Sequence, residues 1–422
     1  ANGMMWLLFF GGNDFTPDFT IDGMNVQDYM FKHFIGSVKE VAKRVKDMPH
    51  VIGFDTLNEP CSGWIGIALD DRHIEGTQED PVLPGLAWSP IDGLYVSHGN
   101  SMDIPNMELS ILKAGFFPKS EVTVNPNEEN LWLHDETDPF MDAGIWRLKE
   151  DGSYEILKND AFQVVNGKEI SFNEDYMFPF INKVAKHLQE MREDWFIFGE
   201  MEAKDIIFNP DLTVPQKVPN NFVNATHWYD FAVQGKQRSF YPISVDVVTR
   251  KFLLGKKNLK KMYLRQIKAI KQASKKINEG CPTLIGEFGI PYNMKNGKAY
   301  KKWAKGKRGK KVWKRHVMML DLMYDVLDEL LIGSTQWCYN PYNRNDLRIG
   351  DCWNQSDCSI YCVDQRENPS DINSGGRAKD GWLRPYARFI QGIPLEVRFD
   401  LKSGEFHLRY LADSSIKEPT EI

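Results

Sequence analysis

The chain has 422 residues, a formal net charge of −6 and 26% charged side chains. This length allows one large domain and a smaller one beside it. No apolar run reaches the roughly eighteen residues that a membrane-spanning helix needs, and the mean hydropathy of −0.44 is typical of a soluble globular protein. The negative net charge gives no evidence for nucleic-acid binding. Twelve tryptophans suit either a large core or stacking on sugar rings.

The two ends of the chain both read as the interior of a fold. The first residues, ANGMMWLLFFGGNDF, have neither a basic start nor a small-residue cleavage site, so they do not predict a signal peptide. Residues 396–422 have the pattern of a β-hairpin that simply stops. We therefore expect the sequence to be a piece of a longer protein, cut at both ends.

Helices and strands alternate along much of the chain. A helix is predicted over Asn25–Met48, because apolar residues recur there at helical spacing, and a strand follows from Val51. The later predictions are a helix over Asn173–Glu193 and a strand over Trp195–Phe198, a strand over Phe222–Thr226, a helix over Leu259–Glu279 and a strand from Thr283, a helix over Val312–Leu331 and a strand over Ser334–Tyr339. This order predicts a parallel sheet with right-handed crossovers.

A long stretch, from residue 61 to about residue 171, lacks this rhythm and is rich in Gly, Pro, Asn and Asp. Within it, residues 144–157 (GIWRLKEDGSYEIL) predict a hairpin. A long insertion after a strand of a parallel barrel belongs on the active-site face, where loops set substrate choice. We interpret it as part of the substrate site and not as a separate domain.

The segment Lys295–Arg315 is strongly basic, with Tyr300, Trp303 and Trp313 interleaved among the lysines. One reading is a solvated lysine-rich loop. The other is contact with an anionic membrane surface beside a lipid-linked substrate.

The six cysteines include no CxxC pair, although Cys352, Cys358 and Cys362 lie close together in sequence. This cluster allows a metal site or a disulfide, but zinc sites favour tighter paired spacing. The alternative is a set of reduced thiols in an intracellular protein.

Two apolar, β-branched runs each end at a glutamate. The run Val51–Pro60 (VIGFDTLNEP) carries Glu59, and the run Pro282–Ile290 (PTLIGEFGI) carries Glu287. A buried parallel strand that ends in a polar residue is how an α/β barrel builds its active-site face. Retaining hydrolysis of a glycosidic bond needs two carboxyl groups about 5 Å apart, one protonated and one ionised.

The neighbours of each glutamate suggest which role it takes. Glu59 follows Asn58 at a strand end, where we expect an apolar pocket, and burial beside another carboxylate raises a carboxyl pKa as a general acid requires. Glu287 has small neighbours that leave room for a sugar, which suits the nucleophile. Either motif alone is weak, since a helix cap also explains Asn-Glu-Pro. Together with His227 and Tyr229 between them and Trp337 after them, they form a specific ordered set.

These motifs resemble the family 5 glycoside hydrolases, in particular the branch of glucosylceramidases, steryl-glucosidases and endoglycoceramidases. The segments that carry the resemblance are LFFGGNDF (Leu8–Phe15), IGFDTLNEP (Ile52–Pro60), VNPNEENLW (Val124–Trp132), LIGEFGIPY (Leu284–Tyr292) and QWCYNPYNRNDLRIGDCWNQSDCSIY (Gln336–Tyr361). The resemblance runs along nearly the whole chain. It implies an α/β fold, a (β/α)8 TIM barrel over residues 1–388 with the insertion at 61–171, followed at 389–422 by the beginning of a small C-terminal β-sandwich.

The resemblance also implies roles for single residues. Glu59 matches the acid/base and Glu287 the nucleophile, while His227 matches a histidine near the pair and Tyr229 the tyrosine that orients the nucleophile. Asn58 matches the asparagine that binds the sugar 2-hydroxyl, and Trp337 the tryptophan under the sugar. His227 and Trp337 also have plain structural readings, as a satisfied histidine and a core tryptophan. Asn354 and Asp357 are candidate ligands for glucose hydroxyls, although a surface turn explains them equally well.

The chain departs from the family in lacking an arginine on an early strand and a histidine motif after the third strand. We therefore expect it to begin just before the helix that precedes the fourth barrel strand, so that strands four to eight are present. A piece without part of its barrel wall is not expected to be fully active, although the parent protein should be.

The leading hypothesis is a retaining β-glucosidase for a glycolipid such as glucosylceramide or a steryl glucoside, with no cofactor and no metal. The alternatives are an endoglycoceramidase, a hydrolase of soluble β-glucan, or a non-catalytic carbohydrate- or lipid-binding protein. The expected partners are the glycolipid or β-glucoside substrate and, through Lys295–Arg315, a membrane surface. The location is not encoded in the chain, with a slight lean towards the cell interior.

Overall fold

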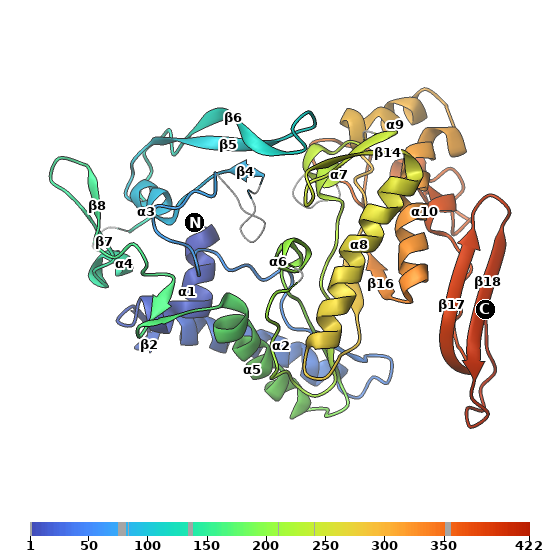
Figure 1. Cartoon of the computed structure of the whole chain (residues 1–422), viewed down its shortest axis with the longest axis horizontal. Coiled ribbons are helices and arrows are strands. Elements are labelled where there is room, and N and C mark those ends of the chain that lie inside the picture. Colours follow the sequence, from blue (N-terminus) through green and yellow to red (C-terminus); the bar gives the residue numbers. More distant parts are fainter. Residues whose placement is uncertain are drawn as a thin grey trace. The chain divides into compact units, whose positions relative to one another are not determined.

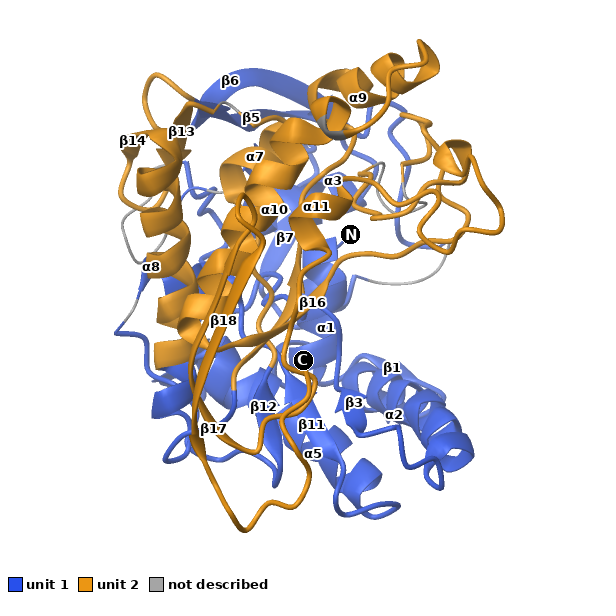
Figure 2. Ribbon diagram, turned by 90° about the vertical axis from the view of Figure 1, so that its right-hand side faces the viewer, with its two compact units in different colours: residues 1–110, 115–224, 273–282 blue, residues 111–114, 225–272, 283–422 orange. Residues whose placement is uncertain are grey.

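The computed structural model of the chain describes residues 2–74, 82, 84–133, 138–209, 211–239, 241–350 and 356–422. The chain divides into two compact units, coloured separately in Figure 2. Unit 1 comprises Ala1–Ser110, Gly115–Asn224 and Ala273–Pro282, and unit 2 comprises Ile111–Ala114, Ala225–Gln272 and Thr283–Ile422.

Unit 1 contains a short parallel sheet and several helices, labelled in Figure 1. Its helices are α1 (Asn2–Phe15), α2 (Val26–Val45), α3 (Pro90–Ser97), α4 (Pro139–Asp142), the π-helical turn η1 (Phe172–Met177), α5 (Phe178–Gln189) and α6 (Ala203–Phe208). Its strands are β1 (Thr20–Ile21), β2 (Met24–Asn25), β3 (Gly53–Asp55), β4 (Gly85–Leu86), β5 (Met102–Ser110), β6 (Gly115–Val124), β7 (Trp146–Leu148), β8 (Tyr154–Ile156), β9 (Val164–Val165), β10 (Lys168–Glu169), β11 (Phe196–Gly199) and β12 (Phe222–Asn224).

The parallel sheet of unit 1 has β11 at its centre. Strand β11 pairs in parallel with both β3 and β12, and Ile197 lies opposite Phe54 on one side and Phe222 on the other. Ile197 is fully buried, as expected for the central strand of a sheet covered on both faces. Because the strands are parallel, their carboxyl ends meet at one edge, where the chain continues into Glu59 and Glu200.

The helices of unit 1 pack against one another through apolar and aromatic side chains. Asn25 caps α2 by accepting a hydrogen bond from the Gln27 amide at 2.9 Å. On α5 the buried residues recur at helical spacing: Phe178, Phe180, Ile181, Val184, Ala185 and Leu188. An aromatic cluster joins α1, α2 and α5, with the ring centroids of Phe9 and Phe31 at 4.9 Å and those of Phe31 and Phe180 at 5.0 Å.

Antiparallel hairpins fill the stretch between residues 61 and 171. Strands β4, β5 and β6 form a three-stranded sheet, and β7 pairs with β8 with Trp146 opposite Ile156. The hairpin predicted over residues 144–157 is therefore confirmed.

Unit 2 contains the second parallel pair and the C-terminal hairpin. Its helices are α7 (Phe231–Lys236), α8 (Gly255–Lys276, whose end falls in unit 1), α9 (Met294–Ala304), α10 (Lys310–Leu330), the 3-10 turn η2 (Val363–Gln365) and α11 (Lys379–Trp382). Its strands are β13 (Ile243–Asp246), β14 (Lys251–Leu254), β15 (Leu284–Phe288), β16 (Gly333–Gln336), β17 (Gly392–Asp400) and β18 (Glu405–Ala412). The antiparallel pair β13 and β14 was not predicted from the sequence.

The predicted helices and strands agree with the structure to within a few residues at their ends. Strands β15 and β16 pair in parallel, as do the strands of the unit 1 sheet, so the α/β class is confirmed. The basic segment Lys295–Arg315 differs from the predicted loop, because α9 and the first turns of α10 occupy most of it. The boundary predicted between residues 388 and 389 does not coincide with the division into units, and it stays a prediction.

The C-terminal hairpin of β17 and β18 is held to α10 by one arginine. Arg384 lies 3.2 Å from Asp321, 3.1 Å from Asp325 and 2.9 Å from Asp328, and its side chain is 6% exposed. Its guanidinium also lies 4.9 Å from the ring centroid of Phe399 on β17. Burial raises the pKa of Asp325 and of Asp328, and Arg384 opposes that shift.

Replacing Arg384 by Met should destabilise the chain by about 3 kcal/mol at neutral pH, because it leaves buried carboxylates without their counter-ion. The raised pKa values mean that the folded state binds protons more readily than the unfolded state, so the loss should shrink as the pH falls towards about 4. Urea unfolding of both proteins at several pH values measures this difference.

Arg388→Met is the matched control, since Arg388 pairs with Glu421 at 2.9 Å while both side chains are more than half exposed. It should cost less than about 1 kcal/mol at every pH. An equal loss in the two variants would show that Arg384 acts only as a surface charge.

Candidate active site

Glu287, the predicted nucleophile, lies near the end of β15 with its carboxylate held from one side. The Tyr229 hydroxyl donates a hydrogen bond to Glu287 Oε2 at 2.8 Å, and His227 Nδ1 lies 3.4 Å from the same oxygen. The side chains of Glu287 and His227 are 14% and 9% exposed. A hydrogen bond to a carboxylate favours its ionised form, which a nucleophile requires.

The segment that presents His227 and Tyr229 is anchored through the residue between them. Trp228 is buried, its Nε1 donates to Gln266 Oε1 at 3.0 Å, and its ring packs edge-on against Tyr263 on α8. The Trp228 amide donates to the Glu287 carbonyl at 2.9 Å. Because successive side chains of an extended segment point to opposite sides, burying Trp228 against α8 turns its two neighbours towards Glu287.

Two glycines allow the close approach of the chain segments around Glu287. A Cβ on Gly286 would lie 2.3 Å from the Ala225 carbonyl oxygen, and one on Gly289 would lie 2.5 Å from the Trp337 carbonyl oxygen. Both distances are too short for any side chain. The small neighbours that the sequence places around Glu287 are thus required by backbone packing.

Trp337, the predicted sugar platform, directly follows β16. Its amide donates to the Phe288 carbonyl at 2.9 Å, and its side chain is only partly buried. The ring is therefore not wholly used by the core, and part of it is available for stacking against a ligand.

Glu59 and Asn58 belong to unit 1, where they follow β3. The Glu59 amide donates to Glu200 Oε1 at 3.0 Å, and Glu59 has a positive φ of 46°. Glu59 and Asn58 are both exposed. The apolar pocket expected around Glu59 is therefore wrong for the part of the chain that the structure describes.

Glu200 is a positioning residue that the sequence reasoning missed. It follows β11 directly, is 4% exposed and accepts the Glu59 amide hydrogen bond. Glu202 does the same for the Ser62 amide at 2.9 Å. The signal was present, because FIFGEME ends a buried strand at a glutamate just as the Glu59 and Glu287 segments do.

Asp357 has a different role from the one predicted. Its two oxygens accept hydrogen bonds from Arg377 at 2.7 and 2.5 Å, and the Tyr300 hydroxyl donates to it as well. The side chains of Asp357 and Arg377 are 1% and 0% exposed. Burial opposes the charge of Arg377, but Asp357 outweighs it and raises the pKa of the guanidinium. A carboxylate used in this way is a structural counter-ion, and we exclude it from the sugar contacts.

Other predicted positions are settled only in part. Asn354 and Cys352 lie outside the described residues. Cys358 and Cys362 are buried free thiols, so they form no disulfide with each other. In the described ranges, no helix combines the length and apolar character needed to cross a bilayer.

Comparison with known proteins finds one matching domain family and several more distant relatives. Residues 384–422, from Arg384 onwards, match the glycoside hydrolase family 5 C-terminal domain. The chain is 26% identical to a glucosylceramidase of Rhizopus delemar, covering 100% of this chain and 62% of that protein. It is 28% identical to a glucosylceramidase of Cryptococcus neoformans, covering 97% and 57%. Identity to the ergosteryl-beta-glucosidase of Saccharomyces cerevisiae is 24%, covering 86% and 50%.

The chain is similar to family 5 glycoside hydrolases, over a matching C-terminal domain and along its curated relatives. The predicted resemblance to the glucosylceramidase and steryl-glucosidase branch is thereby confirmed. The fold is that of the crystal structure of Cryptococcus neoformans sterylglucosidase 1 with tris, with a TM-score of 0.84 at 24% identity over 98% of this chain and 62% of that one. The chain thus spans about three fifths of the length of the curated glucosylceramidases, 62% and 57%.

Replacing Tyr229 by Phe should lower the rate of any reaction that uses Glu287 by about ten- to a hundredfold, the value of a hydrogen bond to a charged group. The ring remains, so the fold and the affinity for a ground-state ligand should be kept. Steady-state kinetics with a glucoside substrate separates kcat from KM. A change confined to KM would mean that Tyr229 only binds substrate.

Proposed function

We propose that the chain carries the catalytic residues of a retaining β-glucosidase that acts on a glucosylated lipid. The observation that carries this proposal is the Glu287 carboxylate at the end of β15, bonded by Tyr229 and facing His227. Such an arrangement holds the carboxylate in one orientation, as a nucleophile needs.

In the first step the Glu287 carboxylate attacks the anomeric carbon and forms an ester with the sugar. The bond from that carbon to the glycosidic oxygen breaks, and Glu59 gives its proton to this oxygen, so that the lipid leaves as an alcohol. The mechanism requires both carboxyl groups to reach the same glycosidic bond.

In the second step Glu59, now ionised, takes a proton from water while the water oxygen attacks the anomeric carbon. The ester to Glu287 breaks, glucose is released, and both carboxyl groups return to their starting states. The exposure of Glu59 supports this role, since a group that takes a proton from water in the second step benefits from access to solvent.

The sugar contacts are assigned to Asn58, through the 2-hydroxyl, and to Trp337, through stacking. Asn58 is exposed and Trp337 is partly exposed, which supports this assignment. Asn354 remains a proposed ligand of the sugar. We further propose the (β/α)8 barrel for residues 1–388 and a small C-terminal sandwich beginning at 389–422.

The relatives support a glucosylated lipid as the substrate class. Two of them are named glucosylceramidase and one ergosteryl-beta-glucosidase, so the shared chemistry is a β-glucoside on a large apolar alcohol. Cleavage of a longer glycan or of soluble glucan is the competing outcome of the test.

The test combines turnover with covalent trapping. Fluorescent glucosylceramide, a fluorescent steryl glucoside and a soluble cellooligosaccharide are incubated with the full-length parent protein and with its Glu287→Gln and Glu59→Gln variants. In parallel, a fluorinated glucoside with an activated leaving group is used to trap the glycosyl-enzyme, and the labelled peptide is found by mass spectrometry.

We expect lipid glucoside cleavage only, lost in Glu287→Gln and reduced about a thousandfold in Glu59→Gln. The trap should label Glu287 in the unchanged chain and still in Glu59→Gln, because an activated leaving group needs no proton. Glucan cleavage would move the protein to the polysaccharide-active enzymes. If the protein binds the ligand but neither hydrolyses it nor becomes labelled, it is a binding protein, and the proposal is refuted.

A further inference from the structure

Unit 2 contains a cavity of about 510 Å³ between α9, α10 and the segment around Tyr241. Six of its lining residues are cationic: Lys295, Lys298, Lys302, Lys311, Lys314 and Arg315. No acidic side chain is found among its described lining residues. The rest of the wall includes apolar groups such as Met294, Val312 and Met318.

These cations have no anionic partner within the described part of the chain. None of the six forms an ion pair there, although ion pairs are common elsewhere on the same unit, as between Lys260 and Glu329 at 3.0 Å. Arg315 is half-buried against the Tyr241 ring, 4.7 Å from its centroid, and its Nη1 is buried without a hydrogen-bond partner. The positive charge of the cavity is therefore uncompensated.

The cations also perturb one another. Burial, followed by the charges of Arg238, Arg315 and Lys298, lowers the pKa of Lys295. Burial lowers the pKa of Arg315 as well. Like charges collected in a partly enclosed site cost free energy, and an anion in the cavity would relieve that cost.

The dipole of α9 favours Lys302 in its last turn, but helix stability does not explain the cations of α10. Lys311, Lys314 and Arg315 lie in the first turns of α10, where the helix dipole disfavours cations, and no acidic residue is present in the first turn. Of the three aromatic residues of the segment, Tyr300 and Trp313 are buried in the core, while Trp303 is half-buried with Arg308 3.9 Å from its ring centroid. The lysines that line the cavity are available to an external ligand.

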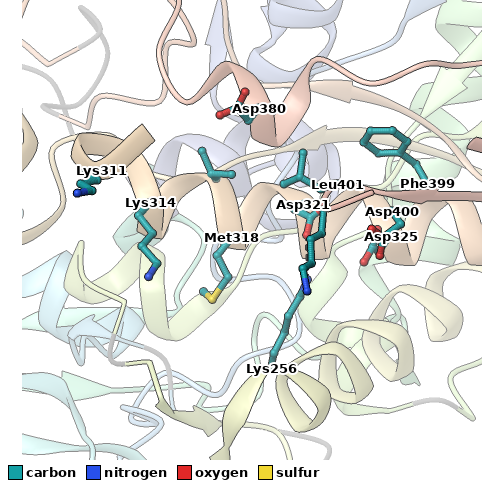
Figure 3. A pocket seen from close by; sticks show the side chains of 12 residues that line it. Lys256, Lys311, Lys314, Met318, Asp321, Asp325, Asp380, Phe399, Asp400 and Leu401 are labelled. Atoms are coloured by element: carbon teal, nitrogen blue, oxygen red, sulfur yellow. Dashed lines mark hydrogen bonds and ion pairs between the residues drawn. The ribbon is translucent and has the colours of Figure 1, made fainter. Parts of the chain in front are cut away.

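A neighbouring cavity has a different charge on its lining residues. It shares Lys311 and Lys314, but it is also lined by carboxylates, among them Asp321 and Asp325 (Figure 3). Its Lys256 lies 2.9 Å from Asp321. That cavity is close to electrical balance, and it attracts an anion less strongly than the cationic one.

We propose that the cationic cavity is a binding site for a phosphoester, a phosphate group with an organic substituent. The six cations suit the phosphate, since lysine and arginine are the usual partners of phosphate oxygens. The apolar wall suits the carbon substituent, for which a cavity of about 510 Å³ leaves space beyond the phosphate. The same chemistry occurs in a phospholipid headgroup and in a free phosphorylated metabolite.

The test uses two probes and two matched variants. The first probe is vesicles of phosphatidylcholine with or without phosphatidylinositol phosphate, free of any glycolipid, and the second is soluble glycerol phosphate. Binding is measured by co-sedimentation for the vesicles and by calorimetry for the soluble ester. Lys298→Gln/Lys302→Gln removes two charges of the cavity, and Lys305→Gln/Lys307→Gln removes two exposed charges of the same segment outside its lining.

The cavity variant should bind the phosphorylated probe about thirtyfold more weakly, from about fivefold per lysine, while the control variant changes little. If the cavity variant loses binding to the vesicles, the site is assigned to a membrane lipid. If it loses binding to glycerol phosphate, the site is assigned to a soluble ester. Equal weakening in both variants would reduce the effect to general surface charge, and no binding of either probe would refute the site. Because no glucoside is present, these results do not depend on the glucosidase proposal.

Discussion

The buried ion pair between Asp357 and Arg377 is the constraint on which unit 2 depends. Two charged side chains at 1% and 0% exposure are tolerated only because they satisfy each other. Tyr300 on α9 donates to Asp357, and the Arg377 guanidinium lies 4.3 Å from the ring centroid of Tyr292, which follows β15. One pair thus ties together the loops that follow β15 and β16 and the helix that carries the cationic cavity.

The two candidate catalytic glutamates are held in opposite ways. The carboxylate of Glu287 is itself bonded, by Tyr229, so its direction is fixed. For Glu59, the backbone amide is held by Glu200 and the residue is exposed. A nucleophile needs a fixed, ionised oxygen, whereas an acid/base group must exchange protons with water. The two kinds of support fit the two proposed roles.

Helix α10 carries cations near its N-terminal end and carboxylates near its C-terminal end. Near its C-terminal end, carboxylates including Asp325 and Asp328 are balanced by the single buried Arg384. Near its N-terminal end, Lys314 and Arg315 line the cationic cavity, whose described lining residues include no carboxylate. Both distributions oppose the helix dipole. The carboxylates near the C-terminal end pair with Arg384, which also contacts the C-terminal hairpin. We propose that the cations near the N-terminal end bind a ligand.

The sequence by itself determined the elements whose cause is local. Hydrophobic periodicity predicted the helices and the parallel strands, and the glutamate after a buried run predicted Glu59 and Glu287. The order of His227, Trp228 and Tyr229 was enough to expect a site there. Only the tertiary structure decided that Asp357 is a buried counter-ion, that Glu200 holds the Glu59 backbone and that the basic segment is helical around a cavity. These features depend on contacts between residues far apart in the chain, and local pattern carries no information about such partners.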